Sequence, residues 1–473
     1  MNPPRIPTAK LGFSEKLGYG LGDTAINLFW QFCNIFLLYY YTDVFGLNAA
    51  AVGTMYLVAN LWDAVNDPMM GAVADRVQTR RGKYRPFLLW FAIPYGVSGY
   101  ALFANPQLSA GGKLVFAYVT FLVFKTTLTA IAVPYGAMMG VISDRSEDRV
   151  ALSTYRFVGA FGGGFAVSLL VRPLVRLFGG PDEVLGFQLT MALFGVVSIA
   201  MLLTTYWTTR ERLEPRIDTV DLATDVRLLF RNRPWVVMGA AAVFTLAAVA
   251  VRGAVTVHYF KYYVGRADEV MFSLGTPGTP FFLEFDEVTV FMASGMLAFI
   301  LAVSLTGVVG RALGKRNALM LLTIGNALTM VAFFFIPPSA YRTMFAVNVL
   351  GNLLAGPTPA LVWAMYTDVA DYGEWKFGRR ATGLVLSAAM FAQKLGLTIG
   401  GAVSGWMLEA FGFVPNAEQS AQALLGIRIM FALVPGGLAL ANGLILVLYP
   451  LTRARVTAME RELAHRRAGE SAR

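Results

Sequence analysis

Long apolar segments recur along the whole chain and are separated by short polar turns. Each segment is long enough to cross a hydrocarbon core of about 30 Å as a helix, and about twelve can be distinguished. They lie near residues 18–41, 48–75, 86–104, 112–142, 153–178, 185–208, 234–263, 288–308, 317–336, 341–370, 381–410 and 423–449. The pattern predicts an all-α membrane protein with twelve transmembrane helices.

Composition and charge agree with this prediction. Of the 473 residues, 56% are hydrophobic and 14% are charged, which is more apolar than an average soluble domain. Lys and Arg are concentrated before the first span, after the last span and in every second loop, so these segments should face the cytoplasm. We expect a multi-pass plasma membrane protein, in a bacterial inner membrane, with both termini cytoplasmic and no cleaved signal peptide. The net charge of +10 is therefore a topology signal rather than a nucleic-acid site.

The chain divides into two similar halves. A charged linker at 208–234 separates an N-terminal six-helix bundle, 1–207, from a C-terminal one, 235–450, which is followed by a tail at 451–473. The turn "GAVADRVQTRRGKYRP" after the second span is echoed by "GVVGRALGKRN" after the eighth, and "SDRSEDRVALSTYR" after the fourth by "TDVADYGEWKFGRR" after the tenth. Such parallel repeats indicate a secondary transporter with its substrate site at mid-membrane, between the halves.

The second span contains the stretch "NLWDAVNDPMMG", residues 60–71. Asp63 and Asp67 are four residues apart and share a helix face, and Asn66 falls beside them. A charge at the centre of a membrane helix costs roughly 2.5 to 3.5 kcal/mol, so buried carboxylates are usually functional. Oxygen ligands suit a hard cation such as sodium, and paired carboxylates can also share a proton. The alternative is that both aspartates merely pair with a basic neighbouring helix.

A second polar stripe lies on the first span. Asp23, Asn27, Trp30 and Asn34 recur at helical spacing and offer both polar groups and an aromatic face, which suits a sugar ring. Alternatively, Asp23 anchors the cytoplasmic end of its helix.

Other chemistry is excluded by residue count. Cys33 is the only cysteine and His258 and His465 are the only histidines, so neither an intrachain disulfide nor a transition-metal cluster is expected. No nucleophile with a matching base is evident either, which makes a membrane-embedded enzyme an unfavoured alternative. We expect no enzyme activity and no cofactor, apart from a coupling ion that is sodium, at Asp63 and Asp67, or a proton.

Several motifs carry a family resemblance. "YYYTDVFGLNAAAVGTMYLVANLWDAVNDPMMGAVADR", "RRGKYRPF", "VPYGAM", "STYRF" and "DVADYGEWKFGRR" resemble the glycoside-pentoside-hexuronide:cation symporters, the melibiose permease group of the major facilitator superfamily. The resemblance implies two six-helix bundles and cation-coupled symport of a sugar, glycoside or uronate by alternating access. The nearest alternative is a symporter of lysolipids or other amphiphiles. We expect a monomer that binds a small molecule and no nucleic acid.

The resemblance also implies roles for particular residues. The cation-binding set would be Asp63, Asn66, Asp67 and Thr129. For substrate binding, the resemblance implies Asp23, Arg156 and Lys394; the stripe on the first span adds Asn27 and Trp30, and the segment "VPYGAM" adds Tyr135. Arg156 and Lys394 lie well inside their helices, so pairing with Asp23 when no substrate is bound would limit the cost of burying them. Ala132 stands where the melibiose permeases have a second sugar-binding aspartate, so galactoside specificity is not implied.

Lys125 departs from the family, since this position is small in the melibiose permeases. It lies four residues before Thr129 and therefore shares its helix face. An ammonium group close to Asp63 and Asp67 would replace sodium electrostatically, and coupling would then use protons. Alternatively, Lys125 extends toward the membrane interface or turns into the sugar cavity.

The remaining charges are expected to act in gating or topology. The turns after helices 2 and 10 would cross-link helix ends in one conformation, through Asp75, Arg76, Asp368, Asp371, Glu374 and Arg380. The aromatic loop at 265–288 would cap the external entrance, and the tail would be helical and solvated or membrane-bound.

Overall fold

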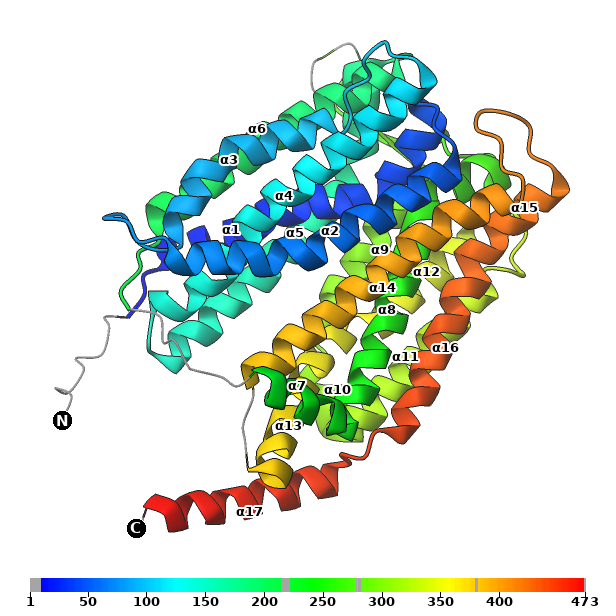
Figure 1. Cartoon of the computed structure of the whole chain (residues 1–473). Coiled ribbons are helices and arrows are strands. Elements are labelled where there is room, and N and C mark those ends of the chain that lie inside the picture. Colours follow the sequence, from blue (N-terminus) through cyan, green and yellow to red (C-terminus); the bar gives the residue numbers. More distant parts are fainter. Residues whose placement is uncertain (1–9, 214–221, 278, 280–281, 379–381, 472–473) are drawn as a thin grey trace. The chain divides into compact units, whose positions relative to one another are not determined.

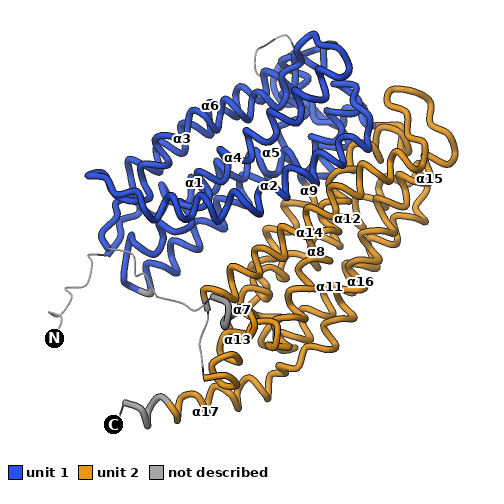
Figure 2. The backbone as a smooth tube through the Cα atoms, in the orientation of Figure 1, with its two compact units in different colours: residues 1–217, 267–293 blue, residues 218–266, 294–473 orange. Residues whose placement is uncertain are grey.

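The computed structural model describes residues 10–213, 222–277, 279, 282–378 and 382–471. Within these ranges, each span predicted from the sequence coincides with a helix or with a run of consecutive helices (Figure 1). The only sheet in the described part of the chain is one two-stranded hairpin. The structure forms two compact units, which Figure 2 colours separately.

Unit 1 comprises residues 1–217 and 267–293. Its helices are α1 (Phe13–Tyr39), continued by the π-helical turn η1 (Tyr40–Val44), α2 (Ala49–Arg76), α3 (Arg85–Ala101), α4 (Ala110–Ile142), α5 (Ser146–Gly179) and α6 (Glu183–Thr208). The hairpin strands β1 (Val270–Leu274) and β2 (Leu283–Asp286) also belong to it, as does the start of α9 (Glu287–Val303).

Unit 2 comprises residues 218–266 and 294–473. Its first helices are α7 (Leu222–Arg231), inside the predicted linker, and α8 (Arg233–His258) with η2 (Tyr259–Val264). The rest of α9 follows, and then α10 (Thr306–Leu313), α11 (Lys315–Ala332), α12 (Tyr341–Ala355), α13 (Thr358–Phe377), α14 (Thr382–Ala410), α15 (Ala421–Arg428), η3 (Ile429–Leu433), α16 (Val434–Ile445), η4 (Leu446–Leu448) and α17 (Arg453–Ser471).

Short polar side chains start several of these helices. Asn48, Ser109 and Asp182 each accept a hydrogen bond from the backbone N–H three residues later, at the beginning of α2, α4 and α6. Asn232 does the same for α8, where Pro234 occupies the first turn. Such caps satisfy amide groups that have no partner inside the helix, so the turn sequences define where the spans begin.

Seven helical segments are long and apolar enough to cross a membrane, or eight if the bent pair α9 and α10 forms one span. The predicted spans that fall short correspond to α1, α2, α3 and α11. α3 is short, with 17 residues, and α11, with 18, begins with the polar residues Lys315, Arg316 and Asn317. α1 and α2 are long enough, but they carry the acidic residues Asp23, Asp63 and Asp67 in their interiors. The count of twelve therefore remains a prediction, although all twelve ranges are helical.

The two units share a local feature that supports an internal repeat. α1 ends in a π-helical turn before Gly46, and α8 ends in one before Gly265. In both, a backbone N–H bonds the carbonyl five residues earlier: Phe45 to Tyr40 (2.7 Å) and Gly265 to Phe260 (3.0 Å). Both glycines have positive φ, 81° and 73°, which glycine adopts without steric cost. π-helical turns are rare, so their recurrence at the end of a long helix in both units indicates a structural repeat.

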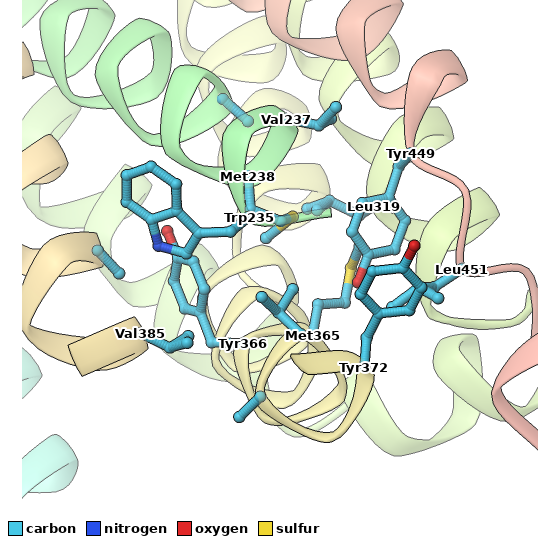
Figure 3. Packing of buried hydrophobic residues seen from close by; sticks show 14 of the residues in the cluster. Trp235, Val237, Met238, Leu319, Met365, Tyr366, Tyr372, Val385, Tyr449 and Leu451 are labelled. Carbon is cyan, nitrogen blue, oxygen red and sulfur yellow. The ribbon is translucent and has the colours of Figure 1, made fainter. Parts of the chain in front are cut away.

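Unit 2 has a hydrophobic core formed by α8, α11, α13 and the segment after α16. Figure 3 shows Met238, Leu319 and Met365 among the rings of Trp235 and Tyr449. Each of these five side chains is at most 8% exposed. Burial of such side chains stabilises the fold independently of any polar site.

The predicted entrance loop is a hairpin fixed to α5. Arg172 of α5 bonds Asp286 (Nε to Oδ2, 2.6 Å) and Asp268 (3.0 Å). Arg176, one turn later, reaches the same two carboxylates at 3.2 and 3.0 Å. The other oxygen of Asp286 accepts the backbone N–H of Thr289 at 2.8 Å, which caps the first turn of α9. The hairpin is therefore an integral part of unit 1.

We expect Arg172→Met to lower the thermal unfolding temperature of the detergent-solubilised protein strongly. Arg172 and Asp286 are 7% and 0% exposed, and removing one partner of a buried ion pair costs about 3 to 5 kcal/mol. Arg176→Met is the matched control, because the Arg176 side chain is 20% exposed and its loss leaves the Arg172 pair intact. Equal unfolding temperatures for the two variants would contradict a dominant role of Arg172.

Candidate functional site

The candidate cation site lies where α2 packs against α4 in unit 1 (Figure 1). Thr129 of α4 donates a hydrogen bond to Asp67 of α2 (Oγ1 to Oδ1, 2.8 Å). One turn away, Lys125 Nζ lies 2.7 Å from Oδ2 of Asp63. Residues four apart on α4 thus face residues four apart on α2, as the helical repeat requires.

Two polar atoms of this site are buried without a hydrogen-bond partner: Oδ1 of Asp63 and Nδ2 of Asn66. Both residues are 5% exposed. A buried polar atom without a partner costs free energy, so such atoms commonly mark a place where an ion, a water molecule or a substrate binds. The oxygens of Asp63, Asp67 and Thr129 form a set that suits a proton or a hard cation.

Lys125 points into this site rather than toward the membrane interface or away into another cavity. Its ammonium group bonds the side-chain oxygen of Asn60 at 2.8 Å as well as Asp63. Beside it, Trp62 Nε1 donates to the Thr126 hydroxyl at 2.9 Å. Asn60 was not among the residues expected from the sequence, because its role depends on the register between α2 and α4.

The candidate substrate site lies between α1 and α5 of the same unit. Arg156 Nε bonds Oδ2 of Asp23 at 2.9 Å, and the guanidinium carbon lies 5.1 Å from the centre of the Tyr135 ring. Tyr135 stacks on Tyr19 with ring centroids 4.8 Å apart, and each hydroxyl donates to the backbone carbonyl of the other residue, at 2.6 and 3.2 Å. A charged pair beside an aromatic face can bind the hydroxyls and the apolar face of a sugar.

Glycines bring α1 and α5 close enough for this pair to form. A Cβ atom on Gly159 would collide with the carbonyl oxygen of Gly20. Asp23 and Arg156 lie within one turn of these two glycines on their respective helices. The close approach of the two backbones therefore brings the Asp23 and Arg156 side chains within reach of each other.

The other expected substrate residues occupy varied positions. Asn27 donates its amide N–H to the Asp23 backbone carbonyl at 2.9 Å, and Trp30 is partly buried one turn further along α1. Lys394 lies on α14 in unit 2, where its backbone carbonyl accepts the hydroxyl of Thr398 at 2.8 Å. Its expected pairing with Asp23 stays a prediction.

Two of the predicted gating residues form contacts inside their own units. Asp75 bonds Lys83 (3.3 Å) and accepts from the Tyr84 hydroxyl (3.1 Å) in unit 1. Asp368 bonds Lys315 at 2.7 Å in unit 2. Arg76 is exposed on α2, Asp371 and Glu374 lie on α13, and Arg380 falls outside the described residues. The predicted cross-links between helix ends of the two halves are not tested by these contacts.

Sequence reasoning missed an acidic residue that organises the turn after α2. Glu211 accepts the backbone N–H groups of Lys83, Tyr84 and Arg85 at 2.7, 2.8 and 2.7 Å. A carboxylate at the start of α3 satisfies free amides and complements the helix dipole. No signal in the sequence links Glu211, in the charged linker, to a turn far earlier in the chain.

The comparisons with known proteins match this architecture. Residues 18–453 match the model of the family described as MFS/sugar transport protein, so the chain belongs to that family. The chain is 37% identical to the inner membrane symporter YicJ of Escherichia coli (strain K12), over 89% of this chain and 88% of the relative. It is 36% identical to the putative glycoside/cation symporter YagG of the same organism, over 98% and 97%.

A solved structure agrees at the level of fold. The crystal structure of a D-xylose-proton symporter superposes with a TM-score of 0.65 and 15% identity, covering 92% of this chain and 97% of that one. The resemblance to the glycoside-pentoside-hexuronide:cation symporters and the major facilitator fold are thus confirmed. The protein is a multi-pass membrane transporter and not an enzyme.

We expect Gly159→Ala to lower both thermal stability and substrate affinity. The added methyl group must push α1 away from α5, and overpacking of this kind costs about 1 to 3 kcal/mol. Gly162→Ala on the same helix is the control, because a Cβ there meets no atom within 4 Å. The control should be neutral or gain up to about 1 kcal/mol from helix propensity. Equal behaviour of both variants in thermal unfolding and ligand binding would show that the close approach is dispensable.

Proposed function

We propose that the protein is a symporter that couples the uptake of a sugar, glycoside or uronate to the movement of a monovalent cation. The observation that carries the proposal is the carboxylate pair on α2, in which Asp63 is buried with Oδ1 unsatisfied and the half-buried Asp67 is bonded to Thr129 of α4. Charge is rarely placed inside a membrane helix without such a role. The name of the relative YagG, a putative glycoside/cation symporter, supports the same function.

In this proposal Asp63, Asn66, Asp67 and Thr129 form the cation site. Their carboxylate, amide and hydroxyl oxygens are ligands for sodium, and the two carboxylates are also acceptors for a proton. Binding of the cation reduces the negative charge on α2, which lowers the cost of moving the site between conformations. The ion thereby becomes a condition for the transport step.

Asp23, Arg156 and Tyr135 form the sugar site in this proposal, together with Asn27, Trp30 and Lys394. The Asp23–Arg156 bond uses one carboxylate oxygen and the guanidinium Nε, so the other oxygen and the terminal NH₂ groups can bind substrate hydroxyls or a uronate carboxylate. The buried Tyr135 ring, stacked on Tyr19, supports the Arg156 guanidinium from behind, and the partly exposed Trp30 offers an aromatic face for the sugar. The absence of an acidic side chain at Ala132 argues against a melibiose-like preference.

Transport would proceed by alternating access of the two halves, 1–207 and 235–450, joined by the linker at 208–234. Both termini, including the tail at 451–473, would lie in the cytoplasm, because the basic loops are on that side. The charged turns with Asp75, Arg76, Asp368, Asp371, Glu374 and Arg380 would form and break contacts during the cycle. One chain contains both halves, so a monomer suffices.

We expect wild-type protein in proteoliposomes to accumulate at least one sugar from a radiolabelled panel of methyl xylosides, methyl glucosides and glucuronate. The uptake should require an inward gradient of sodium or protons. Lysophosphatidylcholine is included as the competing substrate class. Accumulation of the lysolipid with no uptake of any sugar would overturn the proposed substrate class.

Asp67→Asn should abolish accumulation against a gradient while leaving downhill exchange measurable. The substitution keeps an oxygen but removes the charge that the cation neutralises, so substrate binding is no longer linked to ion binding. Asp182→Asn is the matched control, because asparagine caps the start of α6 as well as aspartate does. Wild-type accumulation by Asp67→Asn would remove this residue from coupling.

Lys394→Ala should raise the sugar concentration needed for half-maximal uptake with little effect on the amount of inserted protein. A basic residue that contacts substrate hydroxyls contributes charge-assisted hydrogen bonds of roughly 1.5 to 3 kcal/mol, equivalent to about 10 to 100-fold in affinity. Lys261→Ala serves as the control, since Lys261 lies in η2, after α8, and bonds Asn416 at 2.7 Å. Unchanged affinity in a correctly inserted Lys394→Ala protein would favour a structural role.

A further inference from the structure

We propose that Lys125 determines the coupling ion: its ammonium group occupies the place of a bound sodium ion between α2 and α4, so that the protein couples to protons. The inference rests on the proposed function, because it concerns the ion of the same cation site. It assigns to this chain a specificity residue that the family resemblance does not supply.

The geometry places a positive charge directly on the oxygens of the site. Lys125 Nζ lies 2.7 Å from Asp63 Oδ2 and 2.8 Å from Asn60 Oδ1. The side chains of Lys125 and Asp63 are 15% and 8% exposed, so solvent screens this pair poorly. The aromatic ring of Phe121, 5.7 Å from the ammonium group, covers it from its own helix.

Neighbouring bonds hold Lys125 in this position. The Thr126 hydroxyl accepts a hydrogen bond from the Trp62 indole, and the Thr129 hydroxyl donates one to Asp67. Hydrogen bonds therefore join α4 to α2 immediately after Lys125 and again one turn further on. These two bonds fix the rotation of α4 relative to α2. The lysine side chain therefore emerges toward Asp63 and cannot reach the membrane interface without breaking two charge-assisted bonds.

A sodium ion does not fit beside this ammonium group. A sodium ion at Asp63 Oδ2 would have to displace the ammonium group, because that oxygen already accepts its hydrogen bond at 2.7 Å. A second cation within a few ångström of Lys125 would also be repelled, since like charges at short distance in a poorly screened site interact strongly. The ammonium group therefore supplies at Asp63 the positive charge that a bound sodium ion would otherwise bring.

Lys125 compensates only one of the two carboxylates of the cluster. Asp63 and Asp67 each carry a formal negative charge and Lys125 a formal positive one. Because the ammonium group already occupies the place beside Asp63, a proton is the coupling cation that needs no set of oxygen ligands of its own.

Titratable groups on the neighbouring elements include Lys113 of α4, which bonds the backbone carbonyl of Phe45 at 3.1 Å rather than Asp63 or Asp67. They also include Cys33 of α1, whose carbonyl accepts a hydrogen bond from the Tyr56 hydroxyl of α2, and Asp43 of η1, which accepts one from Thr42. Neither Cys33 nor Asp43 carries a positive charge that would neutralise the cluster instead.

The first test measures ion binding without any substrate. Purified wild-type protein and the variants Lys125→Ala and Lys125→Arg are heated in 100 mM sodium chloride, potassium chloride or choline chloride, taking about 100 mM as a saturating ion concentration. We expect no sodium-specific increase of the unfolding temperature for wild type and Lys125→Arg, which keep the charge. Lys125→Ala frees Asp63 and Asn60 for a mobile ion and should gain a sodium-specific increase. The control variant is Lys113→Ala. Lys113 lies on the same helix but bonds the backbone carbonyl of Phe45, so this variant should behave as wild type.

The second test measures coupling in proteoliposomes, with whichever sugar of the panel the wild type accumulates. In sodium-free buffer, an inward proton gradient should drive accumulation by the wild type, and added sodium should change it less than twofold. For Lys125→Ala, sodium should stimulate uptake by about tenfold, which is the change expected from 1.4 kcal/mol of additional binding free energy.

The outcomes separate this inference from the proposed function. A sodium-specific rise in the unfolding temperature of the wild type, or sodium-dependent accumulation, would overturn the role of Lys125 while leaving symport intact. If the wild type takes up sugar only down its concentration gradient, and a proton gradient does not drive accumulation, proton coupling is overturned too. If no sugar is taken up under any gradient, the proposed function fails, and the thermal test on wild-type protein still decides whether the site accepts sodium. That wild-type result does not depend on whether Lys125→Ala folds.

Discussion

The cost of placing carboxylates inside a membrane helix governs how the first half of the molecule is built. Asp63 and Asp67 interrupt α2 at positions that an apolar helix would fill with leucine or valine, and each must be compensated from outside α2. The helix α4 supplies this compensation with Lys125 and Thr129, which bond the two carboxylates at 2.7 and 2.8 Å. The register between the two helices is thus determined by charge and hydrogen bonding as much as by packing.

Arginines within the helices of the two units are held in different ways. In unit 1, Arg156 and Arg172 pair with the carboxylates of Asp23 and Asp286, at 2.9 and 2.6 Å. In unit 2, Arg252 bonds the backbone carbonyl of Phe431 at 3.2 Å and lies over aromatic rings, including that of Phe431 at 4.3 Å. The π-helical turn η3 contains this carbonyl, and such turns free backbone groups from the regular helical pattern. An arginine held by backbone and aromatic groups has a structural role, whereas paired charges can exchange partners with a ligand.

The predictable part of the molecule is the part encoded in local periodicity. Apolar run lengths predicted the twelve ranges that are helical, although not α7 in the linker. Four-residue spacing placed Asp63 and Asp67 on one helix face, and Lys125 and Thr129 on another. The direction of Lys125 could not be decided, because a long flexible side chain can extend either way along its helix and only the register with Asn60 selects one. Likewise, the pairing of Arg172 with Asp286 depends on how a distant loop folds. The same polar residues that identify the site also make α1 and α2 less apolar than the helices that qualify as membrane spans.

A tethered charge differs from a mobile ion in one respect that matters for symport. Lys125 is always present at high effective concentration beside Asp63, so its neutralising effect does not depend on the ion concentration on either side of the membrane. For the same reason it cannot store the energy of a gradient, because it never leaves the site. In the proposed mechanism, coupling therefore resides in the charge that Lys125 leaves uncompensated. One negative charge remains between Asp63 and Asp67, and only a species that binds on one side and dissociates on the other can make the transport step depend on its gradient.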